Sequence, residues 1–338
     1  MNILAIESSC DETAVAIVRD GRQALTDCIT SQVDLHRIYG GVVPEIASRK
    51  HIEAIYGLAD QALTEAGLTR KDIDAVAVTY APGLIGAVLV GVNFAKAAAL
   101  AMNKPLIPVH HIRGHIAANY LAYPELKPPF LCLVVSGGHT MIVDVRDYTK
   151  MEILGTTLDD AAGECFDKVG RVLGMPYPGG AALDKAAQQG IEGKYSLPRS
   201  KPGANPYDMS FSGLKTASLN LIHHAQQVGE ELDIPSLCAE FTAAVSDTLV
   251  PRVVMAMEQT GYRKLAVAGG VAANSRIRRD ITAAAEKLGA QVYMPPLKLC
   301  GDNGAMIGAQ AYYEYLAGNV ADMSLNAYAT KSILGEAL

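Results

Sequence analysis

The sequence has no CxxC pair of cysteines, no tryptophan and no excess of positive charge. Scattered cysteines favour reduced thiols in a cytosolic protein over a disulfide framework or a cysteine-based zinc site. The net charge of −6 gives no support for a stand-alone nucleic-acid binder, because such proteins are usually basic. A polynucleotide would have to meet a local basic patch or a helper protein. The six cysteines are Cys10, Cys28, Cys132, Cys165, Cys238 and Cys300.

The sequence also lacks the features of a membrane protein. The N-terminus has no basic segment, so it does not resemble a signal peptide. We see no apolar run that approaches the ~20 residues of a membrane span. The longest candidate, around Leu84–Val92, is broken by Gly86 and Gly91. We therefore expect no membrane contact and a cytoplasmic location.

An internal repeat dominates the chain. The segment NILAIESSCDETAVAIVRD aligns without gaps on PFLCLVVSGGHTMIVDVRD, so that Ser9 falls on Ser136 and Thr13 on Thr140. Each copy alternates like two strands joined by a short turn. A chain of 338 residues has room for roughly two domains. The repeat therefore indicates duplication of a whole domain.

Each copy of the repeat is followed by the pattern helix, strand, helix, strand. This alternation predicts an α/β fold with two lobes and a ligand cleft between them. In the first half we expect a helix around 52–63 and strands at 75–79 and 105–109. In the second half we expect a helix near 237–257, strands at 264–268 and 291–294, and a helix from 273. Two stretches break the symmetry, a connecting segment at 110–129 and an insertion at 155–215. We also expect a helix over 159–173 and a last helix from 303 to about 318.

The turn SGGHT at Ser136–Thr140 carries the first chemical signal. Two glycines between strands allow backbone N–H groups to bind an anion. A tight hairpin turn is the simpler interpretation of Gly-Gly alone. The corresponding turn of the first half, SSCDE, has an acid where this one has glycine, which favours a nucleotide-like ligand. The sequence contains no GxxxxGK[ST], so it has no P-loop.

The segment AGGVAANSR at Ala268–Arg276 follows a predicted strand and precedes a helix. Glycines at that place allow a ligand to approach the start of the helix. Asn274 either binds such a ligand or caps the helix, and the sequence leaves these two roles equally open.

The segment HHIRGH places His111 and His115 four residues apart, on one face of a helix. This spacing is common for divalent metals, although two surface histidines are a more frequent explanation and His110 is a competing ligand. Asp302 is a candidate third ligand, although an Asp at a helix start is more often an N-cap. Two histidines and a carboxylate suit Fe(II) or Zn(II). The position of the HExxH glutamate is Ile112, so a metallopeptidase is disfavoured.

The insertion contains a short acidic helix and the turn YPGG. For Asp159 and Asp160 we favour a solvated helix start. Asp167 lies deeper in the helix, where its helix propensity is poor, and Asp184 follows the YPGG turn. Basic residues cluster in two places and could meet phosphates, although solvated surfaces explain them equally well. They are Lys194, Arg199 and Lys201 in the insertion, and Arg276, Arg278 and Arg279 beside Asn274.

Taken together, these blocks resemble one family. IESSCDET, HHIRGH, SGGHT, LDDAAGECFDKVG, YPGG, GGVAAN and CGDNGAMI look like the signature blocks of the tRNA threonylcarbamoyladenosine transferases of the bacterial TsaD type. The resemblance runs from Met1 to about Gly318. It implies the duplicated fold of actin, sugar kinases and heat-shock chaperone ATPases, with a nucleotide in the interlobe cleft.

The resemblance also implies an activity and a site. Such enzymes transfer a threonylcarbamoyl group from threonylcarbamoyl-AMP to the exocyclic amine of the adenosine beside the anticodon, in tRNAs that read codons beginning with A. They work with the paralogue TsaB and the ATPase TsaE. The family's metal ligands fall on His111, His115 and Asp302, and an acid implicated in catalysis falls on Asp11. Its substrate-contacting positions fall on Val134, Val135, Ser136, Gly137, Gly138, Asp167, Gly180, Asp184 and Asn274.

From these patterns we predict an N-terminal lobe at 1–109, a metal-bearing connection at 110–129, a C-terminal lobe at 130–302 and a final helical segment at 303–338. The metal is expected to be Fe(II), with Zn(II) as second candidate, and an adenine nucleotide could occupy the site. The alternatives are a non-catalytic ATP-binding scaffold of the same fold and a sugar kinase. Both leave the His111/His115 pair without a role.

Overall fold

The structure is a computed structural model, and it describes residues 1–201 and 203–334. It divides the chain into two compact units. The first unit consists of Met1–Pro128, Arg146–Met151 and Pro295–Leu338, and the second of Pro129–Val145 and Glu152–Met294. The predicted boundaries at 109, 129 and 302 stay a prediction.

The sheet of the first unit has the order β3-β2-β1-β4-β5. Strand β1 pairs with β2 in antiparallel fashion and with β4 in parallel, and β4 pairs with β5 in parallel. The three parallel strands therefore end at the same edge of the sheet. The strands are β1 (Asn2–Glu7), β2 (Glu12–Arg19), β3 (Gln23–Ser31), β4 (Ala75–Ala81) and β5 (Leu106–His110).

The sheet of the second unit repeats this topology. Its order is β10-β9-β6-β7-β8, in which β6 pairs antiparallel with β7 and parallel with β9. Strands β6, β7 and β9 thus take the places of β1, β2 and β4, which confirms the duplication. The strands are β6 (Phe130–Val135), β7 (Thr140–Val145), β8 (Met151–Thr156), β9 (Lys264–Ala268) and β10 (Gln291–Tyr293).

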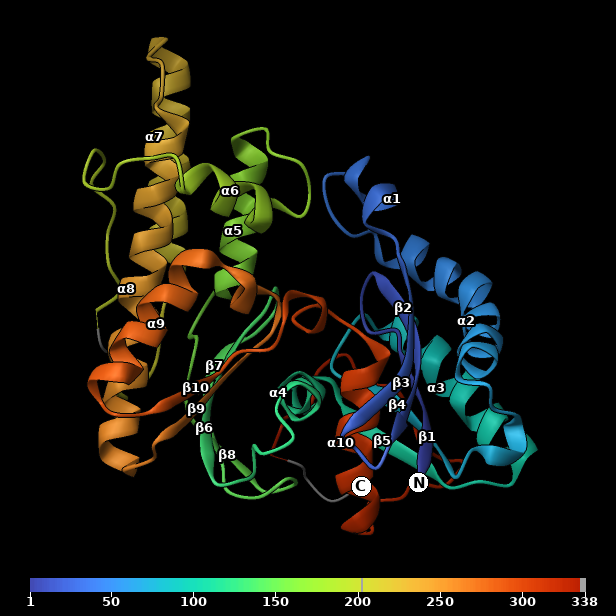
Figure 1. The fold of residues 1–338 in the computed structure, drawn as a ribbon. Coiled ribbons are helices and arrows are strands. Elements are labelled where there is room, and N and C mark those ends of the chain that lie inside the picture. The colour runs from blue at the N-terminus through green and yellow to red at the C-terminus, as the bar shows by residue number, and fades with distance from the viewer. Residues whose placement is uncertain (202, 335–338) are drawn as a thin grey trace. The chain divides into compact units, whose positions relative to one another are not determined.

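Helices cover the sheets, as the α/β pattern predicts (Figure 1). The first unit contains α1 (Val33–Arg37), α2 (Pro44–Ala66), α3 (Ile85–Met102), α4 (His111–Ala122) and α10 (Gly304–Leu316). The second contains α5 (Ala162–Val172), α6 (Gly179–Ala187), α7 (Ser212–Val228), α8 (Ile234–Thr260) and α9 (Ser275–Lys287). Short 3₁₀ turns lie at Arg70–Asp72, Gly270–Ala273 and Leu297–Leu299. The predicted helices are confirmed, whereas β3, β8, α6 and α7 were not anticipated.

Successive side chains of a strand point to opposite faces of the sheet. In the first sheet both faces are covered by a hydrophobic core. Leu4 and Ile6 pack in a core with residues of α2 and α3. Ile3 and Ala5 pack on the opposite face, in a core that includes Ala118 of α4 and residues of α10. Helix α4, which carries the histidine pair, is therefore anchored against the sheet by its own apolar residues.

Helix α3 corrects the expectation that no apolar segment is long enough to span a membrane. Its 18 residues have a mean hydropathy of 1.8, which meets the length and composition of one span. The apolar run considered in the sequence ended at Val92, but the structure continues the helix to Met102. Val88, Val92, Ala95 and Ala99 pack in the core beside β4, and 33% of the segment is buried. This core-facing stripe accounts for the buried part of the helix.

Candidate functional site

Two histidines and one aspartate converge at the start of α4. The rings of His111 and His115 lie one helical turn apart, with centroids separated by 4.6 Å. The Oδ1 atom of Asp302 lies 3.1 Å from Nε2 of His115 and 3.5 Å from Nε2 of His111. Their potential ligand atoms all lie within 4.8 Å of one another. The predicted trio is brought together, and this geometry could hold one metal ion.

Hydrogen bonds to neighbouring residues decide whether His110 competes as a ligand and whether Asp302 is a helix cap. His110 is the N-terminal cap of α4, since its Nδ1 accepts a hydrogen bond from the Ile112 N–H, and its Nε2 lies 3.0 Å from the carbonyl of Lys331. It is thus held away from the trio. The cap of α10 is Asn303, whose Oδ1 accepts from the Met306 N–H at 2.8 Å. The interpretation of Asp302 as an ordinary cap is therefore wrong.

Glu7, which the sequence did not single out, lies directly behind His111. Its Oε2 is 3.0 Å from Nδ1 of His111, and the carboxylate is completely buried at the end of β1. Burial alone would raise the pKa of Glu7, but the charge and hydrogen bond of His111 lower it overall. Burial opposes protonation of His111, yet Asp302 and Glu7 together raise its pKa to about 9. The site therefore favours positive charge between two carboxylates.

Asp11 lies in the turn between β1 and β2 and is 7% exposed. Its carbonyl accepts from the Gln32 N–H at 2.9 Å. The preceding turn is tied down by His51, whose Nε2 lies 2.9 Å from the Cys10 carbonyl and whose Nδ1 lies 2.7 Å from Oγ1 of Thr13. Asp11 is therefore presented by a rigid turn.

Glu12 is a second acid that the sequence analysis missed. Burial, followed by the negative charges of Asp11 and Asp302, raises the pKa of Glu12 to about 9. Two neighbouring carboxyls in a partly dry site do not both ionise readily. Burial and the neighbouring acids therefore favour the protonated form of Glu12.

The cysteines are unpaired, as predicted. Burial and the charge of Asp11 raise the pKa of the Cys10 thiol far above its ordinary value. Since the thiolate is the nucleophile, Cys10 is not a candidate catalytic group despite its place in the turn.

The glycine turn of the second unit lies between β6 and β7. The Ser136 N–H donates to the His139 carbonyl at 2.8 Å, which closes the turn. Gly137 and Gly138 are exposed, neither has a positive φ, and a Cβ at either would meet nothing within 4 Å. The chain itself therefore does not require glycine at these two positions. A ligand that approaches the backbone closely would require it.

At two other positions beside this turn, packing within the chain leaves no room for a side chain, so glycine is required. A Cβ on Gly163, in the first turn of α5, would lie 2.5 Å from the Ser136 carbonyl oxygen. Gly269 has a φ of +93°, and a Cβ there would lie 2.4 Å from the Val135 carbonyl oxygen. These close approaches bring α5 and the β9–α9 connection against the Ser136 turn. Val134 and Val135 are completely buried in β6, so only their backbone could meet a ligand.

Asn274 lies at the same edge of the sheet, because Val134 of β6 pairs in parallel with Ala268 of β9. Ligands of α/β sheets commonly bind at the carboxyl ends of such strands. Its Oδ1 caps α9 by accepting from the Ile277 N–H at 3.0 Å, so the cap role is confirmed. Among residues 1–201 and 203–334, none accepts a hydrogen bond from its Nδ2 amide, which leaves that donor for a ligand.

Two of the predicted carboxylates contact helix starts within the second unit. Oδ1 of Asp167 accepts from the Gly180 N–H at 3.3 Å, in the first turn of α6. Asp184 accepts from the N–H of Ser275 at 3.2 Å and from its Oγ at 2.8 Å, at the start of α9. Backbone N–H groups at helix starts stabilise negative charge. These acids therefore connect α5, α6 and α9 around the glycine turn.

Asp159 is exposed, but the helix start that it contacts is that of α7. Its carboxylate accepts from the N–H and the hydroxyl of Ser212 and from the N–H of Phe211, at the beginning of α7. Asp160 forms an ion pair with Lys215 at 2.5 Å. The expectation of a solvated surface holds for Asp159, which is exposed. It is wrong for Asp160, whose side chain is 13% exposed and paired with Lys215.

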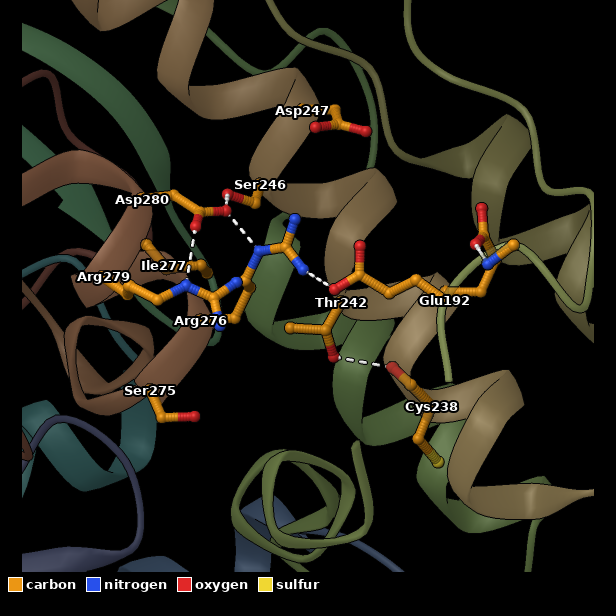
Figure 2. Close-up of polar contacts among 12 residues, drawn as sticks. Glu192, Cys238, Thr242, Ser246, Asp247, Ser275, Arg276, Ile277, Arg279 and Asp280 are labelled. Carbon is orange, nitrogen blue, oxygen red and sulfur yellow. Dashed lines mark hydrogen bonds and ion pairs between the residues drawn. The ribbon is translucent and has the colours of Figure 1, made fainter. Parts of the chain in front are cut away.

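The basic clusters are largely neutralised by neighbouring acids. Figure 2 shows Arg276 between Glu192 and Asp280, and Arg279 beside Asp280. Asp280 also accepts a hydrogen bond from Ser246 at 2.7 Å. In the insertion, Lys194 pairs with Asp233, and Arg199 with Glu240 and Asp247. These pairs reduce the positive charge that each cluster offers to phosphates.

Known structures share this architecture. The chain resembles HypF from T. kodakarensis with a TM-score of 0.60 and 14% identity, over 96% of this chain and 49% of HypF. It resembles component A of (R)-2-hydroxyglutaryl-CoA dehydratase from Acidaminococcus fermentans with a TM-score of 0.53 and 14% identity, over 94% and 99% of the two chains. At this identity the likeness concerns the fold alone, and it confirms the two-lobed α/β class.

Sequence relatives are much more similar. The family model of the tRNA N6-adenosine threonylcarbamoyltransferases, TsaD, matches residues 23–309. An enzyme of that name from Moorella thermoacetica is 55% identical over 326 residues, which cover 96% of this chain and 95% of the relative. Another from Clostridium botulinum is 51% identical over 327 residues, with coverages of 97% and 96%. The chain therefore belongs to the tRNA N6-adenosine threonylcarbamoyltransferase family and is a tRNA-modifying transferase.

Proposed function

We propose that this chain transfers the threonylcarbamoyl group of threonylcarbamoyl-AMP to the exocyclic amine of the adenosine beside the anticodon, in tRNAs that read codons beginning with A. The observation that carries this proposal is the convergence of His111, His115 and Asp302 on one point. A scaffold of the same fold would need no such trio. The match of the family model over residues 23–309 supports the substrate assignment.

His111, His115 and Asp302 fit one divalent ion. Two imidazole nitrogens and one carboxylate oxygen leave coordination positions open and suit Fe(II), our first candidate, or Zn(II). The buried Nδ1 of His115 has no hydrogen-bond partner among the described residues, so its ring is not committed to a structural contact. A divalent ion held there supplies a Lewis acid that polarises a carbonyl oxygen.

The glycine turn is proposed to bind the phosphate of the adenylate through the N–H groups of Gly137 and Gly138. Among the described residues, no atom lies within 4 Å of a Cβ built on either glycine, which leaves room for a ligand there. The Nδ2 of Asn274 would donate to the nucleoside. The remaining contacts are proposed for the backbone of Val134, Val135, Ser136 and Gly180 and for the side chains of Asp167 and Asp184. An adenine nucleotide would use the same contacts.

Asp11 is proposed to accept the proton released by the attacking amine. In that step the bond from the amine nitrogen to the carbamoyl carbon forms, the carbon–oxygen bond to phosphate breaks, and AMP leaves. The proton passes from the amine to the Asp11 carboxylate. The raised pKa of Glu12 disfavours Glu12 itself as the proton acceptor, which supports the choice of Asp11.

The protein partners proposed for this reaction are TsaB and TsaE. A cavity of about 160 Å³ between α2 and α3, lined by Tyr56, Leu63, Phe94 and Met102 among others, supports contact with a partner protein. Tyr56, one of its lining residues, is 63% exposed. We further propose a cytoplasmic location without membrane contact. A partner would also help to hold the tRNA, since the chain has a net charge of −6.

The proposal is tested by reconstitution. The protein is incubated with tRNA, threonine, bicarbonate, ATP and an adenylate-forming enzyme, with and without TsaB and TsaE, and the nucleosides of the tRNA are analysed. We expect threonylcarbamoyladenosine in the complete mixture and a loss of about 100-fold or more in His111→Ala, because Lewis-acid assistance is worth several kcal/mol. Exposed His223 and His224 on α7 provide matched controls, and their alanine variants should keep full activity. No modified nucleoside in the complete mixture would exclude the transferase activity.

A further inference from the structure

Glu7 is a buried carboxylate that none of the assignments above uses. It ends β1, where it is completely shielded from solvent. Its Oε1 accepts from the Ser9 N–H at 2.5 Å, and its Oε2 accepts from Oγ1 of Thr79 at 2.6 Å. The third partner of the carboxylate is Nδ1 of His111, 3.0 Å from Oε2. A buried charge is costly unless it is hydrogen-bonded, and here each oxygen has a short contact.

This carboxylate is placed by three segments that are distant in the sequence. Glu7 and Thr79 lie near the carboxyl ends of the adjacent parallel strands β1 and β4. His111 follows β5, which is the next strand in the sheet. The contact from Glu7 to His111 thus follows from the strand order, and the hydrogen bonds from Thr79 and Ser9 fix the direction of the carboxylate.

The contact determines which nitrogen of His111 faces the metal site. A carboxylate at Nδ1 requires a proton there, which leaves the lone pair of neutral imidazole on Nε2. It is Nε2 that faces Asp302. The hydroxyl of Ser9 also lies 3.2 Å from Nδ1, so a polar partner flanks the carboxylate on the same side of the ring.

His115 provides the internal comparison. Its Nε2 faces Asp302 just as that of His111 does, but its Nδ1 is buried without a hydrogen-bond partner in the described part of the chain. The two histidines therefore differ at Nδ1, which faces a carboxylate in His111 and has no polar partner among the described residues in His115. Oriented and unoriented ligands differ in how much freedom they lose when a metal binds.

We propose that Glu7 is a positioning residue of the metal site, which holds His111 in the tautomer with a free Nε2 and thereby tightens the binding of a divalent cation. This inference rests on the proposed metal role of His111, His115 and Asp302. Outer carboxylates of this kind typically contribute 10–100-fold to metal affinity. The expected effect of losing the negative charge of Glu7 is therefore a loss of about 10–100-fold in affinity, without loss of the three ligands.

The variant that tests it is Glu7→Gln in the full chain. Metal-free protein is titrated with Co(II), followed by its visible absorption, and with Zn(II) in competition with a chelator of known affinity. The matched control is Asp74→Asn, which removes one negative charge at the opposite end of β1, where Asp74 accepts from the Asn2 N–H. We expect 10–100-fold weaker binding in Glu7→Gln and wild-type affinity in Asp74→Asn.

A second measurement needs no variant and remains decisive if Glu7→Gln fails to fold. Protein labelled with ¹⁵N-histidine is loaded with Zn(II), and the ring nitrogens are assigned by long-range ¹H–¹⁵N NMR. His111 should carry its proton on Nδ1 and bind zinc through Nε2. Zinc bound to Nδ1 of His111, or equal affinities of Glu7→Gln and wild type, would overturn the role of Glu7 while the metal site stands. A wild-type protein that binds neither ion would overturn the proposed metal site, and this inference with it.

Discussion

The guanidinium group of Arg113 donates to the main-chain carbonyl of Ile333 from both Nε, at 3.0 Å, and Nη2, at 2.8 Å. Arg113 lies on α4 between the two histidines, and its third contact is an ion pair with Glu314 of α10 at 2.9 Å. The helix that carries two of the candidate metal ligands is therefore fastened to the C-terminal part of the chain.

Arg113→Met should destabilise the protein by about 3–5 kcal/mol. The substitution leaves buried Glu314 without its cationic partner, and uncompensated buried charges are costly. The free energy of unfolding in urea measures the effect. Arg37→Met is the control, because Arg37 pairs with Asp34 on the surface and should change stability by less than about 1 kcal/mol. A loss below about 1 kcal/mol in Arg113→Met would mean that Gln310 and Asn319, which also bond Glu314, suffice.

Gly163→Ala and Gly137→Ala should separate packing from ligand binding. A methyl group on Gly163 would collide with the Ser136 carbonyl, so we expect a loss of about 1–3 kcal/mol in stability. A methyl group on Gly137 would contact nothing in the chain, so stability should stay within about 0.5 kcal/mol. Binding of an adenine nucleotide, measured by calorimetry, should nevertheless weaken about tenfold in Gly137→Ala. Unchanged nucleotide affinity there would argue against the phosphate role of the turn.

Asp11→Asn should lower kcat by about 10²–10⁴-fold, the range for loss of a general base. Nucleotide affinity and metal content should not change, since Asp11 is proposed to act only on the incoming amine. Glu12→Gln is the companion variant and should be less damaging, because its raised pKa already keeps Glu12 protonated. The comparison is made with the reconstituted assay. If Glu12→Gln is inactive and Asp11→Asn is active, the two acids have exchanged roles.

His51 should give the protein an acid-sensitive stability. Burial lowers the pKa of His51 below its ordinary value of 6.5, although the Cys10 carbonyl opposes the shift. The folded state thus excludes a proton that the unfolded chain binds, so the contribution is complete above pH ~6.5 and is lost as the pH falls below it, by up to about 1.4 kcal/mol per pH unit. Urea unfolding of wild type and His51→Gln at pH 7.5 and 5.5 checks this. The stability difference should shrink at pH 5.5, and a constant difference would contradict it.

The sequence predicted the regular parts of the fold well because duplication presents the same pattern twice. Ser9 and Ser136 reach equivalent turns, and the central strands follow the predicted order. The strands β3 and β8 were missed since both lie at sheet edges, where exposed residues interrupt the apolar pattern. Helix α6 was missed because it begins with two glycines, which are weak helix formers.

The sequence could predict only those parts of the candidate site whose residues lie close together in the chain. His111 and His115 have a helical spacing, so their pairing was visible in the sequence. Glu7 was not, because a single acid within a strand gives no signal until the sheet brings it to Thr79 and His111. The helix that Asp159 contacts could not be predicted for the same reason, because Asp159 stabilises the start of α7, which is remote in the sequence, and not that of α5. Contacts between remote segments were therefore the part that local patterns could not supply.

The return of the chain to its first sheet has a consequence for synthesis on the ribosome. The first unit includes Pro295–Leu338, and α10 packs against β1 and β2 so closely that a Cβ on Gly308 would lie 2.5 Å from Val18. The segments of the second unit end at Met294, so they have all been translated before α10 emerges. The half of the protein that is translated first is thus completed last. A nascent chain therefore cannot bring Asp302 to His111 and His115 until every segment of the second unit has been translated.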